Sequence, residues 1–168
     1  EGTPEARVTL RGDRLDRMFD NLPYDNLAGQ WGGIRFHEGS FDNRITHAMV
    51  RGTTWGIKCD STDLSRTTLT IHNSIIHNST ANLVDIACNR VRITNSELSD
   101  AGYSVLAIHK GIVDVTHCTL VNYYFYDIRI SRSNIAMILI GSCIVTAIII
   151  LCNIDNMSLR LGIGIPLT

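Results

Sequence analysis

Three stretches of the chain decide its fold: LTIHNSII at residues 69–76, VRITNSEL at 91–98 and VDVTHCTL at 113–120. Each begins 22 residues after the one before it, and apolar residues hold the first, third and eighth positions in all three. A fixed period of this length indicates one structural unit stacked on copies of itself, with each copy supplying part of a shared core.

A second, shorter apolar pattern recurs with the same step, at residues 84–86, 106–108 and 128–130. Alternation that is rich in β-branched residues predicts β-strands, and Asn, Asp, Ser and Gly gather between the stretches, where the chain must turn. A leucine-rich repeat has a similar period, but its unit returns through a helix or an extended turn. Two strand-like stretches in each repeat, with no room for a helix, favour an all-β, right-handed parallel β-helix solenoid.

We expect one β-helix domain over residues 1–168, as a fragment of a longer chain. Looser copies of the pattern precede Ile57, and residues 11–30 are predicted to form an inserted loop with a short helix at 13–19. Residues 131–168 are predicted to form an irregular terminal coil or an abnormal end. Their apolar run at 135–152 approaches the length of about 20 residues that spans a bilayer, so a further coil, a membrane helix and an abnormal end stay as alternatives.

Polar residues follow the same step as the apolar ones. Asn73 and Asn95 form one pair, and Ser74, Ser96 and Cys118 share the next position. Stacked amides inside a bend can bond one another and the turn backbone, so we predict that these five residues form a structural ladder. A second polar column is expected to occupy turns that tolerate a positive φ, and its members are Asn78, Asp100 and Asn122.

Composition limits the classes of function. Charged residues make up 18% of the chain, below the roughly 25% that is typical of globular proteins. The net charge of −1 gives no global basic field, so we predict no nucleic-acid partner. The five cysteines include no CxxC pair and fit no zinc template. They are interpreted as small buried hydrophobic residues.

Several motifs also resemble a known family. The runs GDRLDRMF at residues 12–19, LPYD at 22–25 and GQWGGI at 29–34, with NSIIHN at 73–78 and THCTL at 116–120, resemble right-handed parallel β-helix proteins of Bacteroidetes. The resemblance covers about residues 1–130. These relatives are mostly uncharacterised secreted proteins or lipoproteins. The resemblance implies an extracellular or outer-membrane location, with membrane contact only through a lost N-terminal lipid anchor, and a polysaccharide or cell-surface partner.

Pectin lyase-like relatives of this fold act on glycans, so a lyase or hydrolase is the alternative function. A hydrolase needs paired carboxylates on one face, and a lyase needs calcium-binding acids beside a basic residue. The candidate acids and bases are Asp60, Asp63, Asp85, Asp100, Asp114 and Asp127, and Lys58, Lys110, Arg129 and Arg132. Their spacing yields no catalytic pair, and the six histidines form no metal motif. We therefore predict no catalytic residue, no metal site and no cofactor.

Aromatic residues are the candidates for ligand contact. Tyr123, Tyr124, Phe125 and Tyr126 follow one another in a predicted turn, where sugar rings can stack on exposed aromatic rings; other aromatic candidates include Trp31, Trp55 and Tyr103. The function that the sequence favours is a non-catalytic, cell-surface or secreted domain for glycan or partner interaction. A purely structural solenoid stalk stays as a third hypothesis.

Overall fold

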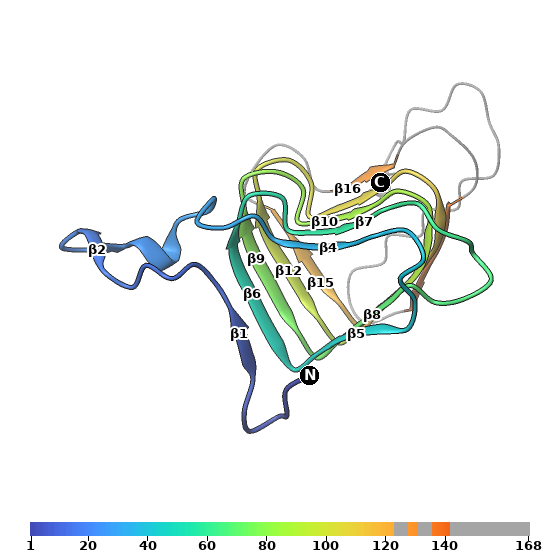
Figure 1. Cartoon of the computed structure of the whole chain (residues 1–168), viewed down its shortest axis with the longest axis horizontal. Coiled ribbons are helices and arrows are strands. Elements are labelled where there is room, and N and C mark those ends of the chain that lie inside the picture. Colours follow the sequence, from blue (N-terminus) through green and yellow to red (C-terminus); the bar gives the residue numbers. More distant parts are fainter. Residues whose placement is uncertain (123–127, 131–135, 142–168) are drawn as a thin grey trace, which may run out of the picture.

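The protein is a parallel β-solenoid of about 4 turns. Its structure, a computed structural model, describes residues 1–122, 128–130 and 136–141. In Figure 1 three parallel sheets form the sides of a roughly triangular coil, and an arm after β1 extends away from it. The predicted all-β solenoid is confirmed, with successive coils about 22 residues apart.

Each sheet takes one strand from each coil. Sheet I has the order β1 (Val8–Leu10), β6 (Ala48–Thr53), β9 (Ile75–Ser79), β12 (Glu97–Ala101) and β15 (Thr119–Val121). Sheet II has the order β4 (Ile34–Phe36), β7 (Ile57–Cys59), β10 (Val84–Ile86), β13 (Leu106–Ile108) and β16 (Ile128–Ile130). Sheet III has the order β5 (Asn43–Thr46), β8 (Leu69–His72), β11 (Asn89–Thr94), β14 (Gly111–Thr116) and β17 (Ala136–Gly141).

Each complete coil contains three strands, where the sequence suggested two stretches. The repeated stretch at 69–76 is divided between β8 of sheet III and β9 of sheet I. The division falls at Asn73, whose φ of 49° is left-handed. One left-handed residue redirects the strand into the next sheet, and Asn is among the residues that tolerate this conformation best.

Left-handed residues recur at the same two places in successive coils. The corner between sheets III and I carries His47, Asn73, Asn95 and His117, with φ between 49° and 53°. At the end of the sheet I strands, Gly52, Asn78 and Asp100 have φ between 60° and 69°. The predicted positive φ is therefore confirmed for Asn78 and Asp100.

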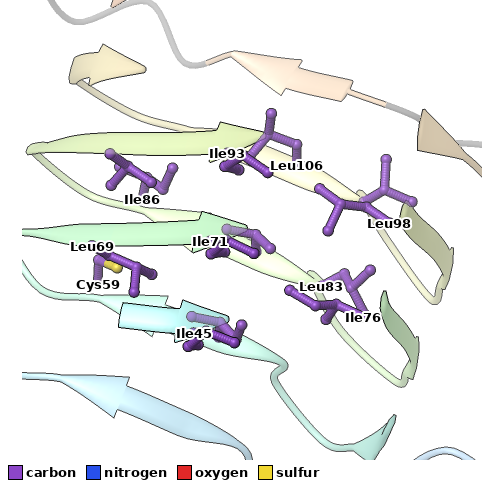
Figure 2. Packing of buried hydrophobic residues seen from close by; sticks show 14 of the residues in the cluster. Ile45, Cys59, Leu69, Ile71, Ile76, Leu83, Ile86, Ile93, Leu98 and Leu106 are labelled. Atoms are coloured by element: carbon purple, nitrogen blue, oxygen red, sulfur yellow. The ribbon is translucent and has the colours of Figure 1, made fainter. Parts of the chain in front are cut away.

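The core lies inside the coils and consists of columns of aliphatic side chains. Figure 2 shows one column with Ile45, Ile71 and Ile93 above one another, in the register that pairs β5, β8 and β11. Ile71 and Ile93 are fully buried. Burial of one such side chain contributes roughly 1.5–3 kcal/mol, so each coil depends on its neighbours for stability.

Polar groups and a thiol complete the interior near the corner between sheets II and III. Asn89 is buried, and its Nδ2 donates to the carbonyl oxygens of Cys59 and Asp60 at 3.3 and 2.9 Å. Its Oδ1 accepts from the hydroxyls of Thr62 and Thr68, both at 2.9 Å. Beside it, burial raises the pKa of the Cys59 thiol to about 12, so this cysteine behaves as a small apolar residue.

The short helix predicted at 13–19 is wrong. β2 (Arg17–Phe19) instead pairs antiparallel with β3 (Leu22–Pro23), and a single 3₁₀ turn, η1 (Tyr24–Asn26), follows. A helix of seven residues is too short to be stable without tertiary contacts. The hairpin needs only the turn at Asp20, whose carbonyl accepts a 2.6 Å hydrogen bond from Arg17 Nη1.

The last strand, β17, lies within the region 131–168 that was predicted to be irregular. β17 joins sheet III beside β14, with Ile138 opposite Val113, so this step is longer than the regular one. Residues 131–135 and 142–168 lie outside the described residues. The alternatives for the apolar run at 135–152 therefore stay open beyond β17.

The left-handed corner gives a direct test at Asn95. Asn95→Ala should lower the free energy of unfolding by about 1–2 kcal/mol, because a Cβ-bearing residue without a local polar side chain is strained at positive φ. Asn95→Gly should stay within about 0.5 kcal/mol of the wild type, since glycine adopts this φ without strain. Urea unfolding followed by circular dichroism measures both, and equal losses would contradict the assignment of this corner.

Candidate functional site

Two exposed aromatic residues occupy the turn that joins sheets I and II. Trp55 follows β6, and Tyr103 follows β12, two coils further along the solenoid. Ala81 holds the turn of the coil between them: its N–H donates to Thr54 O at 3.0 Å, and its carbonyl accepts from the N–H of Tyr103 at 3.3 Å. We call this surface, made by Trp55, Ala81 and Tyr103, the aromatic flank.

The aromatic flank is shaped by small residues. A Cβ on Gly32 would lie 2.6 Å from the Trp55 ring, and one on Gly33 would lie 3.1 Å from it. The indole therefore packs directly on glycine backbone, yet it stays 43% exposed, and Tyr103 stays 59% exposed. Since neighbouring parallel strands lie about 4.8 Å apart, the backbones of the two aromatic turns are separated by roughly 9.6 Å along the solenoid, with Ala81 in the turn between them.

The aromatic residues that the sequence favoured, Tyr123 to Tyr126, lie outside the described residues. In the chain they follow Asn122 and precede β16, as Tyr103 precedes β13. Trp31, another candidate, is half-buried against the core, and its Nε1 donates to Arg51 O at 2.8 Å. Of the candidates within the described residues, Trp55 and Tyr103 are the exposed ones.

The outward face of sheet II, next to the aromatic flank, carries acids that are paired with bases. Asp60 accepts from Arg35 Nε at 3.0 Å and lies 3.1 Å from His37 Nδ1. The hydrogen bond from Arg35 lowers the pKa of the Asp60 carboxyl. Asp85 of β10 lies opposite Lys58 of β7 in the sheet, and its Oδ1 is 3.1 Å from His109 Nε2.

The other candidate acids are also dispersed. On sheet III, Asp114 lies 3.3 Å from Arg92 Nε, and Asp63 accepts from Ser65 in its own turn, which lowers the pKa of its carboxyl. Among residues 1–122, 128–130 and 136–141, no three His, Cys, Asp or Glu side chains gather as a metal site would require. Asp127 and Arg132 lie outside those residues.

The five residues of the predicted ladder occupy the corner between sheets III and I. Ser74 and Ser96 are buried, and their hydroxyls donate to the carbonyls of His72 and Thr94, each at 2.8 Å. Cys118 Sγ, half-buried, lies 3.3 Å from Thr116 O. Asn73 and Asn95 lie on the outside of the corner: Asn73 Nδ2 is 3.0 Å from His47 Nε2, and Asn95 is exposed.

The arm, residues 11–30, carries a second exposed surface. Leu15, Met18 and Phe19 are 59%, 48% and 64% exposed, on a hairpin that projects from the solenoid in Figure 1. Its arginines are occupied within the arm: Arg14 pairs with Asp16 and lies 3.6 Å from the centre of the Tyr24 ring. These three apolar side chains are therefore left largely exposed to solvent.

The base of the arm is fixed to the solenoid by a charged contact. Asp25 pairs with Arg51 of β6 and with Arg11, the latter at 3.0 Å, and Asn78 Nδ2 donates to Asn26 O at 2.9 Å. Burial, followed by the charge of Arg51, lowers the pKa of the neighbouring His77. His77 is therefore protonated at neutral pH to a smaller extent than a free histidine.

Comparison with known proteins assigns the chain to no family, so its fold, a β-solenoid, is its classification. No family model, curated protein or solved structure matches it. The resemblance to Bacteroidetes proteins therefore stays a prediction. Within the described part of the chain, no helix has the length and apolar character to cross a membrane.

The charged contact at the base of the arm can be tested by proteolysis. Arg51→Met removes one of the two arginine partners of Asp25, so trypsin should cleave the exposed sites after Arg14 and Arg17 about fivefold faster, as expected for the loss of ~1 kcal/mol. Arg66→Met, which breaks an exposed ion pair with Asp42 elsewhere, is the matched control and should leave these rates unchanged. Equal rates for Arg51→Met and the wild type would show that other contacts hold the arm.

Proposed function

We propose that the chain is a non-catalytic, cell-surface or secreted β-helix domain that binds glycans at the aromatic flank. The observation that carries this proposal is the pair of exposed rings, Trp55 and Tyr103, on one turn surface with the small residue Ala81 between them. Sugar rings present apolar C–H faces, and flat aromatic rings bury these faces at little cost in conformational entropy because they have only two side-chain torsions.

The packing of the Trp55 ring favours a role in glycan binding. Glycine backbone at Gly32 and Gly33 holds the indole from below, so the ring is already positioned before a ligand arrives. A preorganised contact loses less entropy on binding than a mobile one. The backbones of the Trp55 and Tyr103 turns are roughly 9.6 Å apart, a spacing that suits an extended ligand of more than one ring, such as a linear oligosaccharide.

The acids near the aromatic flank support binding rather than hydrolysis. A glycosidase needs one carboxyl group that is protonated at working pH and a second that acts as base or nucleophile. The Arg35 contact holds Asp60 ionised, and Asp85 is engaged by His109 and by Asn82, whose Nδ2 lies 3.1 Å from its Oδ2. Within the described part of the chain, neither acid is paired with another carboxyl group.

Binding to a panel of neutral and acidic polysaccharides, measured by affinity electrophoresis, tests the proposal. The wild type should be retarded by at least one of them, and the double variant Trp55→Ala/Tyr103→Ala should bind that one about tenfold more weakly, as expected when two aromatic contacts of ~0.5–1.5 kcal/mol each are lost.

Phe19→Ser is the matched control, because it removes an exposed aromatic ring of the arm and leaves the aromatic flank intact. Its retardation should equal that of the wild type. If the wild type binds no polysaccharide, the glycan function is wrong and the structural stalk is favoured. If the double variant keeps full retardation with an unchanged circular dichroism spectrum, the glycan binds elsewhere.

A further inference from the structure

A depression of about 250 Å³ lies at the corner between sheets III and I, on a different corner from the aromatic flank. Its polar rim consists of Arg7, Asn73, Asn95, Glu97, His117 and Thr119. Three coils contribute the corner residues, so stacking of the solenoid alone brings Asn73, Asn95 and His117 together. The volume is smaller than the roughly 300–1,000 Å³ of sites for drug-sized ligands, which points to a small molecule.

The backbone N–H groups at the corner and the hydroxyl at the floor of the depression are already hydrogen-bonded within the protein. The N–H groups of Asn73 and Asn95 donate to Thr94 O and Thr116 O at 3.2 and 3.1 Å. The hydroxyl of Ser96 donates to Thr94 O and accepts from the N–H of Ser74 at 3.2 Å. Hydrogen bonds to a ligand are therefore left to the side chains of the rim.

Arg7 enters the depression from a separate segment of the chain. The preceding turn is closed by hydrogen bonds between Thr3 and Ala6 in both directions, at 3.0 and 3.2 Å. It is attached to the corner by the N–H of Val8, which donates to His47 O at 3.1 Å. Gly2 allows this approach, since a Cβ there would lie 2.5 Å from His47 O. Arg7 thus lines the depression together with the two asparagines, and its guanidinium has no hydrogen-bond or ion-pair partner among the described residues.

Glu97 supplies the opposite charge on the rim. Its Oε1 accepts from Ser99 Oγ at 3.2 Å, and no ion pair joins it to Arg7 or to another base in the described part of the chain. A guanidinium matches a carboxylate with two parallel hydrogen bonds, while a carboxylate such as Glu97 attracts an ammonium group. Carboxamides between them can both donate and accept.

We propose that this corner depression binds a small zwitterion of the amino-acid type, with its carboxylate on Arg7 and its ammonium group toward Glu97. The two rim charges sum to zero, so a ligand that carries one charge of each sign leaves neither side chain desolvated and unpaired. Asn73 and Asn95 contact the ligand between its two ends. This site is independent of glycan binding at the aromatic flank.

Titration of the ¹⁵N-labelled protein with glycine and L-serine tests the proposal, with the side-chain amide signals of Asn73 and Asn95 as the readout. Both amino acids should give saturable shifts of these signals. Acetate and methylamine, which carry one charge each, should bind about tenfold more weakly, because each lacks one charge-assisted contact.

Variants separate the site from a general effect of added solute. Arg7→Gln and Glu97→Gln should each weaken binding about tenfold. Asn95→Gly removes one amide while keeping a backbone that suits its positive φ, and should weaken binding less. Arg44→Gln, which removes an exposed arginine outside the depression, is the matched control and should bind like the wild type.

Three outcomes would overturn the proposal. One is the absence of saturable shifts with either amino acid at millimolar concentration. Another is unchanged affinity in Arg7→Gln with the fold intact. The third is acetate binding as tightly as glycine, which would show an anion site. Trp55→Ala/Tyr103→Ala should leave these titrations unchanged, so failure of glycan binding and failure of this site are distinguished.

Discussion

The structure depends on the left-handed residue that ends each strand of sheet III and opens the next strand of sheet I. His47, Asn73, Asn95 and His117 hold this position in four successive coils. Without the turn, the alternating stretch that contains each of them would continue as one straight strand and expose half of its apolar residues. With it, both halves direct aliphatic side chains into the same interior, and the in-register columns of isoleucine, leucine and valine form.

The same corner separates the interior from the surface. Positive φ places Asn95 outside, whereas the next residue, Ser96, is buried and satisfies the backbone. Polar residues in the interior thus stabilise the backbone, as Asn89 also does at the corner between sheets II and III. The turns between the sheets carry exposed side chains, such as Trp55 and Tyr103. There the chain carries the aromatic flank, the arm and the corner depression, in keeping with the general placement of binding residues on loops held by a rigid scaffold.

Much of the fold could be predicted because aliphatic periodicity reports burial directly. The step of 22 residues gave the coils and most core columns. The three-strand coil was missed, although the signal was present: inward residues follow the order Leu69, Ile71, Ser74, Ile76, and the step of three between Ile71 and Ser74 marks the corner. A straight strand has only steps of two.

The candidate sites were less predictable than the fold, because they depend on contacts that do not repeat along the sequence. Trp55 is an effective platform only because Gly32 and Gly33 lie beneath it one coil away, and Arg7 reaches the corner through a turn far from Asn95 in the sequence. The hairpin of the arm lacks the alternation and the Gly-containing turn that are typical of most hairpins, so its sequence does not predict a hairpin.

Disulfide trapping on sheet II tests the three-sheet coil most directly, because the return segment of a leucine-rich repeat would not pair there. Lys58 faces Asp85 in register, whereas the regular step of 22 residues would place Lys58 opposite Thr80. In a parallel sheet, neighbouring strands are close enough for the Cα separation of 4.4–6.8 Å that a disulfide requires. Lys58→Cys/Asp85→Cys should form an intramolecular disulfide under mild oxidation, identified by peptide mass mapping, and Lys58→Cys/Thr80→Cys should not. Cross-linking of the second pair and not of the first would contradict this fold.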